Sequence, residues 1–135
     1  MFLKKEEIIK IEQVLVNSIN PYLIFLFGSA IKGRLREDSD IDIAFLSDKK
    51  IDKYKLFKIS LDLADVINRK VDLVNLNEVS TVFKAQVVAT GKVIYCADEK
   101  RRMYFMMRAL KDYAKLNEER DVVIEKIKQR GRIYG

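Results

Sequence analysis

The chain has 135 residues, of which 49% are hydrophobic and 34% are charged, and its formal net charge is +6. This length supports one domain with a single core, and the composition excludes a disordered chain. Basic residues alternate with acidic ones, which favours a solvated surface over direct nucleic-acid binding. The single cysteine, Cys96, excludes an internal disulfide and predicts a cytoplasmic protein. No apolar run approaches the ~20 residues of a membrane span.

The hydrophobic pattern predicts helices and strands in alternation. Apolar residues at helical spacing predict the helices, and short apolar or alternating runs predict the strands. Asn20-Pro21 should end the first helix, and Gly91 should cap the third. In chain order, the predicted elements are a helix over 5–18, strands over 22–27 and 40–46, a helix over 52–68, a strand over 71–76, a helix over 79–90, a strand over 92–95 and a helix from 98 to 130.

The lengths of the connections predict the topology. The link between the first two strands is too short for a parallel crossover, so these strands should be antiparallel. A helix separates the second and third strands, which should therefore be parallel. The fold class is α/β (α+β), a small mixed β-sheet with helices packed against it and the 92–95 strand at its edge. We expect residues 1–97 to form the core and residues 98–135 to form a helical extension of the same domain.

Two acids open the second predicted strand, and a third lies on its parallel neighbour. Asp40 and Asp42 are two residues apart, so their carboxylates share one face. Such a pair can hold two divalent ions at the spacing used in phosphoryl transfer. Asp72 could complete the ligand set and help to deprotonate an attacking hydroxyl. Because the chain has no histidine, the metal ligands should be oxygens, which indicates Mg²⁺, with Mn²⁺ as the alternative. Histidine-dependent hydrolase mechanisms are excluded.

Gly28 and Ser29 follow the first strand and supply the other half of the predicted site. Glycine lets the backbone approach a phosphate closely, and the hydroxyl can donate a hydrogen bond to it. Lys32 and Arg34 are near enough in sequence to neutralise a triphosphate. Each feature also has a simpler interpretation, because a Gly-Ser pair is often only a turn and strand acids are often solvated. The joint spacing of the glycine turn and the acids favours one metal-dependent nucleotidyl-transfer site. The site differs from a P-loop because no Gly-Lys-Ser/Thr follows.

The joint pattern resembles a known family. Leu26-Phe27-Gly28-Ser29, ten intervening residues, Asp40-Ile41-Asp42 and the later Asp72 are similar to the nucleotidyltransferase signature of the DNA polymerase β superfamily. Residues 27–33 and 38–42 extend the likeness to its smallest members, the minimal nucleotidyltransferases (MNT). The resemblance covers about residues 5–96 and implies a nucleotidyltransferase fold, ATP as substrate and the three acids as catalytic metal ligands. Lys32 replaces a frequent arginine, which keeps the charge but loses bidentate phosphate geometry.

The predicted C-terminal helix suggests a surface for a partner. Its apolar stripe either packs against the domain or also meets another protein, including a second copy of the chain. MNT proteins that resemble this sequence are antitoxins of helical HEPN ribonuclease toxins, and the family transfers AMP from ATP to a toxin tyrosine. The resemblance therefore implies a Mg²⁺-dependent protein adenylyltransferase that neutralises a HEPN toxin. The stripe consists of Met103, Met106, Met107, Leu110 and Tyr113, flanked by Arg101, Arg102, Tyr104 and Arg108.

Two other functions are compatible with the sequence. The chain could neutralise a partner by binding alone, with a catalytically silent nucleotide site. It could also transfer a nucleotide to a small molecule such as an aminoglycoside. The intact acids and Gly28-Ser29 argue against a silent site, and the absence of a visible substrate domain argues against the small molecule.

Overall fold

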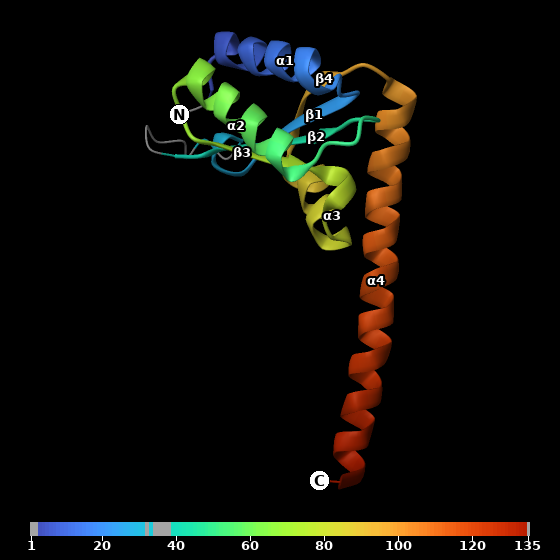
Figure 1. The fold of residues 1–135 in the computed structure, drawn as a ribbon. Coiled ribbons are helices and arrows are strands. Elements are labelled where there is room, and N and C mark those ends of the chain that lie inside the picture. Colours follow the sequence, from blue (N-terminus) through green and yellow to red (C-terminus); the bar gives the residue numbers. More distant parts are fainter. Residues whose placement is uncertain (1–2, 32, 34–38, 135) are drawn as a thin grey trace.

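A four-stranded sheet in the order β3-β2-β1-β4 forms the centre of the fold (Figure 1). The computed structural model describes residues 3–31, 33 and 39–134, with side chains described up to residue 129. Two three-residue 3₁₀ turns, η1 (Gly28–Ala30) and η2 (Leu76–Glu78), follow β1 and β3. The helices and strands are α1 (Lys5–Ile19), β1 (Leu23–Phe27), β2 (Ile41–Leu46), α2 (Lys53–Ile67), β3 (Val71–Asn75), α3 (Thr81–Thr90), β4 (Lys92–Cys96) and α4 (Glu99–Tyr134).

The strand directions agree with the predictions. β1 and β2 are antiparallel, β2 and β3 are parallel, and β4 lies at the sheet edge beside β1. Every predicted helix and strand is present, and the predicted ends differ from the observed ones by a few residues. The mixed sheet with a long C-terminal helix is thus confirmed.

The two faces of the sheet carry separate apolar clusters because side chains alternate along each strand. Ile24, Leu26 and Ile43 lie in the cluster that includes the buried residues of α1 and α2. Phe25 and Ala44 lie in the opposite cluster, with residues of α3 and the first part of α4. The central strand β1 is buried on both faces, as its uninterrupted apolar run predicts.

Gly91 ends α3, as predicted, although its backbone is not that of the usual glycine cap. It has φ −78° and ψ 167°, which is extended rather than left-handed. A Cβ atom at this position would lie 2.5 Å from the carbonyl oxygen of Val87 and 3.1 Å from that of Leu26. A side chain here would therefore collide first with the last turn of α3 and then with β1, which explains the glycine. The left-handed caps are instead Asn20 and Asn68, which end α1 and α2.

Helix α4 runs without interruption over 36 residues, a length of about 54 Å. Ala109 is buried, and Phe105 and Met106 pack against the cluster shared with α3. Met103 and Met107 are 62% and 64% exposed, so the predicted stripe only partly faces the domain. Figure 1 shows the red, C-terminal part of α4 extending away from the sheet and the other helices. In the described part of the chain, no helix combines the length and apolarity required to cross a membrane.

Candidate functional site

The strand register brings the predicted acids to one edge of the sheet. Phe27, the last residue of β1, pairs with Asp42, and Asp42 pairs in turn with Asp72 across the parallel ladder. Asp40 immediately precedes β2, two residues from Asp42 and thus on the same side of the strand. This side carries the cluster that packs against α3, because Ala44 belongs to it. The end of β1 and the starts of β2 and β3 therefore meet where the acids lie.

Gly28 is required by both its conformation and its surroundings. Its φ of +72° lies in the left-handed region, which glycine adopts without strain. A Cβ atom at this position would overlap Oδ2 of Asp42. Gly28 therefore leaves the space that the Asp42 carboxylate occupies, and it brings the η1 backbone directly against that carboxylate.

Ser29 is half-buried within η1, directly after the contact between Gly28 and Asp42. The backbone N–H of Ile31 donates to the carbonyl oxygen of Gly28 over 3.2 Å and closes this turn. The segment is a single 3₁₀ turn of three residues. Its contribution to a phosphate site would come from the Ser29 hydroxyl and from the close backbone approach that a glycine turn allows.

The electrostatics of the three acids indicate a site that favours a cation. The half-buried position of Asp42 raises the pKa of its carboxyl, and the neighbouring Asp72 and Asp40 carboxylates raise it further. Repulsion between like charges is the physical cause of the second effect. Carboxylate oxygens suit a hard divalent cation, which would offset this repulsion. Among the described residues, however, no three Asp, Glu or Cys side chains already form a set of metal ligands.

The structure describes two of the remaining four predicted residues. Asp40 and Asp72 are exposed beside the half-buried Asp42, so an incoming molecule can reach all three. Lys32 and Arg34 lie outside the described residues, and their predicted role in phosphate binding stays a prediction. Five of the seven predicted residues thus belong to three chain segments that meet at one sheet edge.

An aromatic pair borders this edge, and the sequence did not reveal it. The rings of Phe27 and Phe83 meet edge to face, with centroids 5.6 Å apart and planes at 89°. Phe27 is the residue paired with Asp42, and Phe83 belongs to the first turns of α3. The helical pattern of α3 shows which residues are apolar, but not which turn covers the end of β1. No sequence signal therefore singled out Phe83.

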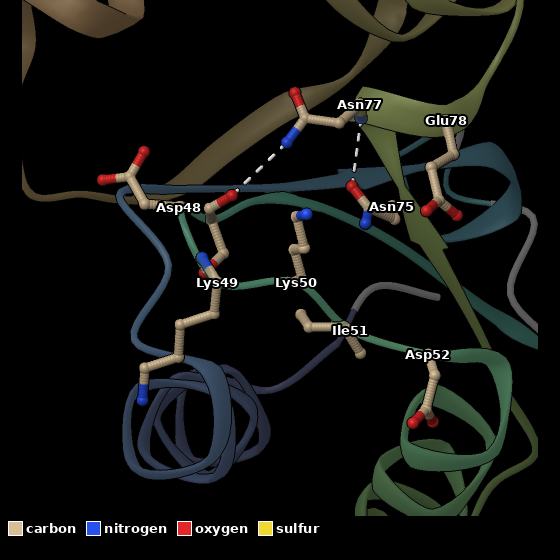
Figure 2. Close-up of a pocket in the computed structure, with 9 residues that line it drawn as sticks. Asp48, Lys49, Lys50, Ile51, Asp52, Asn75, Asn77 and Glu78 are labelled. Carbon is tan, nitrogen blue, oxygen red and sulfur yellow. Dashed lines mark hydrogen bonds between the residues drawn. The ribbon is translucent and has the colours of Figure 1, made fainter.

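A polar pocket of about 510 Å³ lies at the opposite end of β2 and β3 (Figure 2). Its hydrogen bonds hold loops together: Asn77 Nδ2 donates to the carbonyl oxygen of Ser47 over 3.3 Å. Asp52 Oδ1 accepts from the backbone N–H of Lys55 over 2.7 Å and caps α2. These contacts explain the polar residues of the pocket by a structural role, because they join two loops and cap α2. It is lined by Ser47, Asp48, Lys49, Lys50, Ile51, Asp52, Asn75, Asn77 and Glu78.

The sequence of the chain is similar to known nucleotidyltransferases. A family model described as "Polymerase beta, Nucleotidyltransferase" matches residues 9–100. A Shewanella oneidensis protein named protein adenylyltransferase MntA is 34% identical over 105 residues. That alignment covers 78% of this chain and 75% of the relative.

Solved structures extend this similarity over nearly the whole fold. One, described as the crystal structure of a toxin–antitoxin with AMP-PNP, has a TM-score of 0.79 at 33% identity. Another, described as a tri-AMPylated S. oneidensis HEPN toxin in complex with MNT antitoxin, has a TM-score of 0.77 at 30% identity. Each match covers 93% of this chain and 98% of the other. The predicted fold and family are confirmed: this chain belongs to the polymerase β nucleotidyltransferase family, as a minimal nucleotidyltransferase (MNT) related to MntA.

Proposed function

We propose that this chain is a Mg²⁺-dependent protein adenylyltransferase that transfers AMP from ATP to a HEPN toxin and thereby acts as its antitoxin. The observation that carries the proposal is the position of Asp42, which lies beside Asp72 in the sheet and against Gly28. A carboxylate cluster and a glycine turn are the two parts that nucleotidyl transfer requires. The choice of acceptor is supported by the relative named protein adenylyltransferase and by the neighbour that contains a tri-AMPylated HEPN toxin.

The three acids would hold the metal. Asp40, Asp42 and Asp72 offer only carboxylate oxygens. Burial and then the neighbouring carboxylates raise the pKa of Asp42, and a divalent cation would offset the repulsion between these like charges. When bound, Mg²⁺ or Mn²⁺ would polarise the α-phosphate and neutralise charge that develops during its transfer. Asp42 is the central member because it pairs with Asp72 and is two residues from Asp40.

The glycine turn would hold the phosphates. The backbone after Gly28 and the Ser29 hydroxyl would bind the triphosphate, and Lys32 and Arg34 would neutralise its charge. A toxin tyrosine hydroxyl would then attack the α-phosphorus, forming a new O–P bond, while the bond to the bridging oxygen breaks and pyrophosphate leaves. Asp72 is exposed, so a protein acceptor can approach it and the carboxylate can take up the hydroxyl proton.

A label-transfer experiment tests this proposal. The purified chain, α-labelled ATP, Mg²⁺ and the protein encoded by the neighbouring gene are incubated together, and label on that protein is measured. The wild type should transfer label, Asp42→Ala should not, and the control Asp62→Ala should behave as the wild type because Asp62 is exposed on α2. The proposal fails if the wild type transfers no label or if Asp42→Ala transfers as much.

The same preparation separates the alternatives. If a variant with both Asp40→Asn and Asp42→Asn still neutralises the toxin, binding alone accounts for neutralisation. If an aminoglycoside added to the incubation becomes labelled and the protein does not, the acceptor is a small molecule.

A further inference from the structure

Helices α3 and α4 leave a groove of about 330 Å³ between them. Both helices cover the face of the sheet that carries the acids (Figure 1). Leu110 and Tyr113 form the α4 wall of the groove, and Leu110 is 46% exposed, so apolar surface is open to solvent here. The α3 wall consists of Val82, Ala85, Gln86, Ala89 and Thr90.

The groove adjoins the acid edge through the aromatic pair. Phe27 lies directly opposite Asp42 in the antiparallel ladder, so their side chains share one face of the sheet, with Cβ atoms ~5 Å apart. The Phe83 ring meets the Phe27 ring edge to face, with centroids 5.6 Å apart. Gln86 follows Phe83 by three residues, so their side chains are neighbours on α3. From the acids, the surface therefore leads over two phenyl rings to Gln86 and the groove.

Gln86 places an exposed carboxamide beside the apolar part of the groove. Among the described residues, its side chain has no hydrogen-bond partner, whereas the Thr90 hydroxyl already donates to the Gln86 backbone carbonyl over 2.7 Å. A carboxamide offers both an acceptor and donors. It matches adenine, whose N6 amino group donates and whose adjacent ring nitrogen accepts. Guanine presents an acceptor oxygen in place of that amino group and matches less well.

The walls of the groove suit the flat faces of a purine. Tyr113 is half-buried and offers an aromatic ring, and bases of every kind stack on such rings. Val82 and Leu110 add apolar contacts from the two helices. The volume lies at the small end of the range for ligand sites, which suits a nucleobase better than a larger ligand.

We propose that the groove between α3 and α4 binds the nucleobase of the nucleotide, with Gln86 selecting adenine and Tyr113 stacking on it. This inference rests on the proposed function, because it requires a nucleotide whose phosphates lie at the acids and at the Gly28 turn. One ribose separates the α-phosphate from the base, and the rings of Phe27 and Phe83 lie along that path. Gln86 thus determines specificity, and it does not contact the reacting phosphorus.

The first test is the affinity of the full chain for three probes with Mg²⁺, measured by calorimetry: ATP, GTP and tripolyphosphate, which has no base. The wild type should bind ATP about 10-fold more tightly than GTP. Gln86→Ala should remove this preference by weakening ATP binding, and Leu110→Arg, which fills the groove, should weaken ATP binding at least as much. Neither change should alter the affinity for tripolyphosphate. The control Gln13→Ala, an exposed glutamine on α1, should bind all three as the wild type does.

Asp42→Ala distinguishes this inference from the proposed function. It should weaken the binding of all three probes, because a metal ligand is lost. If Asp42→Ala weakens ATP binding while Gln86→Ala and Leu110→Arg do not, the base lies elsewhere. The inference is then overturned and the proposed function stands, including the case in which a partner protein covers the groove. A wild type that binds no nucleotide contradicts both.

A nucleotide analogue tests the hydrogen bond to Gln86. Purine riboside triphosphate differs from ATP only by the absence of the N6 amino group. The wild type should bind it about 10-fold more weakly than ATP. Gln86→Ala should bind the two equally, because the partner of the amino group is gone. A loss that is just as large in Gln86→Ala would show that another group recognises the amino group, and it would overturn the assignment to Gln86.

Discussion

Asp42 and Asp48 lie at opposite ends of β2, and their surroundings shift their pKa values in opposite directions. Burial and the neighbouring carboxylates of Asp72 and Asp40 raise the pKa of Asp42. A hydrogen bond from the Arg101 guanidinium lowers the pKa of Asp48. Arg101 binds both Asp48 oxygens, at 2.8 and 2.6 Å, and its guanidinium lies 3.6 Å from the centre of the Tyr22 ring.

The difference separates an acid with a structural ion pair, Asp48, from the acid that we propose as a metal ligand, Asp42. At one end of β2, Arg101 of α4 pairs with Asp48 and lies over the Tyr22 ring. These contacts attach the start of α4 to the segments that follow β2 and precede β1. At the other end, acids accumulate, and the causes that shift the pKa of Asp42 include no cation of the described residues. Clusters of like charge reduce the stability of the free protein and are typical of sites that bind an ion or a substrate.

The largest expected effect is on activity. Asp42→Ala should lower the rate of nucleotidyl transfer at least about 10²-fold, because the metal would lose the central ligand of the proposed site. Asp48→Ala should leave the rate within a few-fold of the wild type, because its partner is Arg101. Single-turnover rates with labelled ATP measure both. If both variants lost the same fraction of the transfer rate, Asp42 and Asp48 would not differ in function and the proposal would be contradicted.

Gly28→Ala should have the next largest effect. The new Cβ would overlap Oδ2 of Asp42, and the left-handed backbone costs a non-glycine residue about 1–2 kcal/mol. A displaced carboxylate should reduce transfer roughly 10²-fold, whereas Ser29→Ala, which keeps the backbone, should reduce it only about 10-fold. Chemical denaturation and transfer rates are the measurements. A Gly28→Ala protein with wild-type stability and rate would contradict the observed packing.

Asp42→Asn should raise the melting temperature of the free protein by a few degrees at neutral pH. The folded-state pKa of Asp42 is raised, so its charged form costs stability at a pH above that pKa. This cost disappears as the pH falls through the raised pKa towards the ordinary carboxyl value of 3.8, and the advantage of the variant should disappear with it. Thermal melts across this pH range measure the trend. A variant less stable than the wild type at neutral pH would contradict it.

Asp48→Asn should give the smallest change, with the opposite sign. The folded-state pKa of Asp48 is lowered, so its charged form adds stability above the ordinary value of 3.8, and this is lost as the pH falls through the lowered pKa. The variant should therefore melt slightly below the wild type at neutral pH, and the difference should vanish in acid. The effect is small because the ion pair is exposed.

Local patterns in the sequence were sufficient to predict the acid end of the sheet. The alternation of strands places Asp40 and Asp42 on one side, and the intervening helix makes β2 and β3 parallel, which brings Asp72 alongside. The close backbone approach at Gly28 could be predicted because this glycine directly follows a buried strand. These features depend on residues close in sequence or on a single strand pairing.

Long-range packing could not be predicted in the same way. The bond between Arg101 and Asp48 joins residues 53 positions apart, and the position of Phe83 depends on how α3 crosses the end of β1. The apolar stripe of α4 was visible in the sequence. In the structure, the first part of α4 packs against the domain and residues 118–129 are exposed. The point at which packing stops depends on the size of the domain, which the periodicity of the helix does not reveal.

The most direct measurement is a carboxyl-carbon NMR titration of Asp42 and Asp48 in one sample, with and without Mg²⁺. Without the ion, Asp42 should titrate above 3.8 and Asp48 below it. Mg²⁺ should lower the pKa of Asp42 and leave that of Asp48 unchanged, because only the first belongs to a cluster that a cation would neutralise. An Asp42 that titrates at or below Asp48, or that does not respond to Mg²⁺, would contradict the assignment of the acid cluster as the metal site.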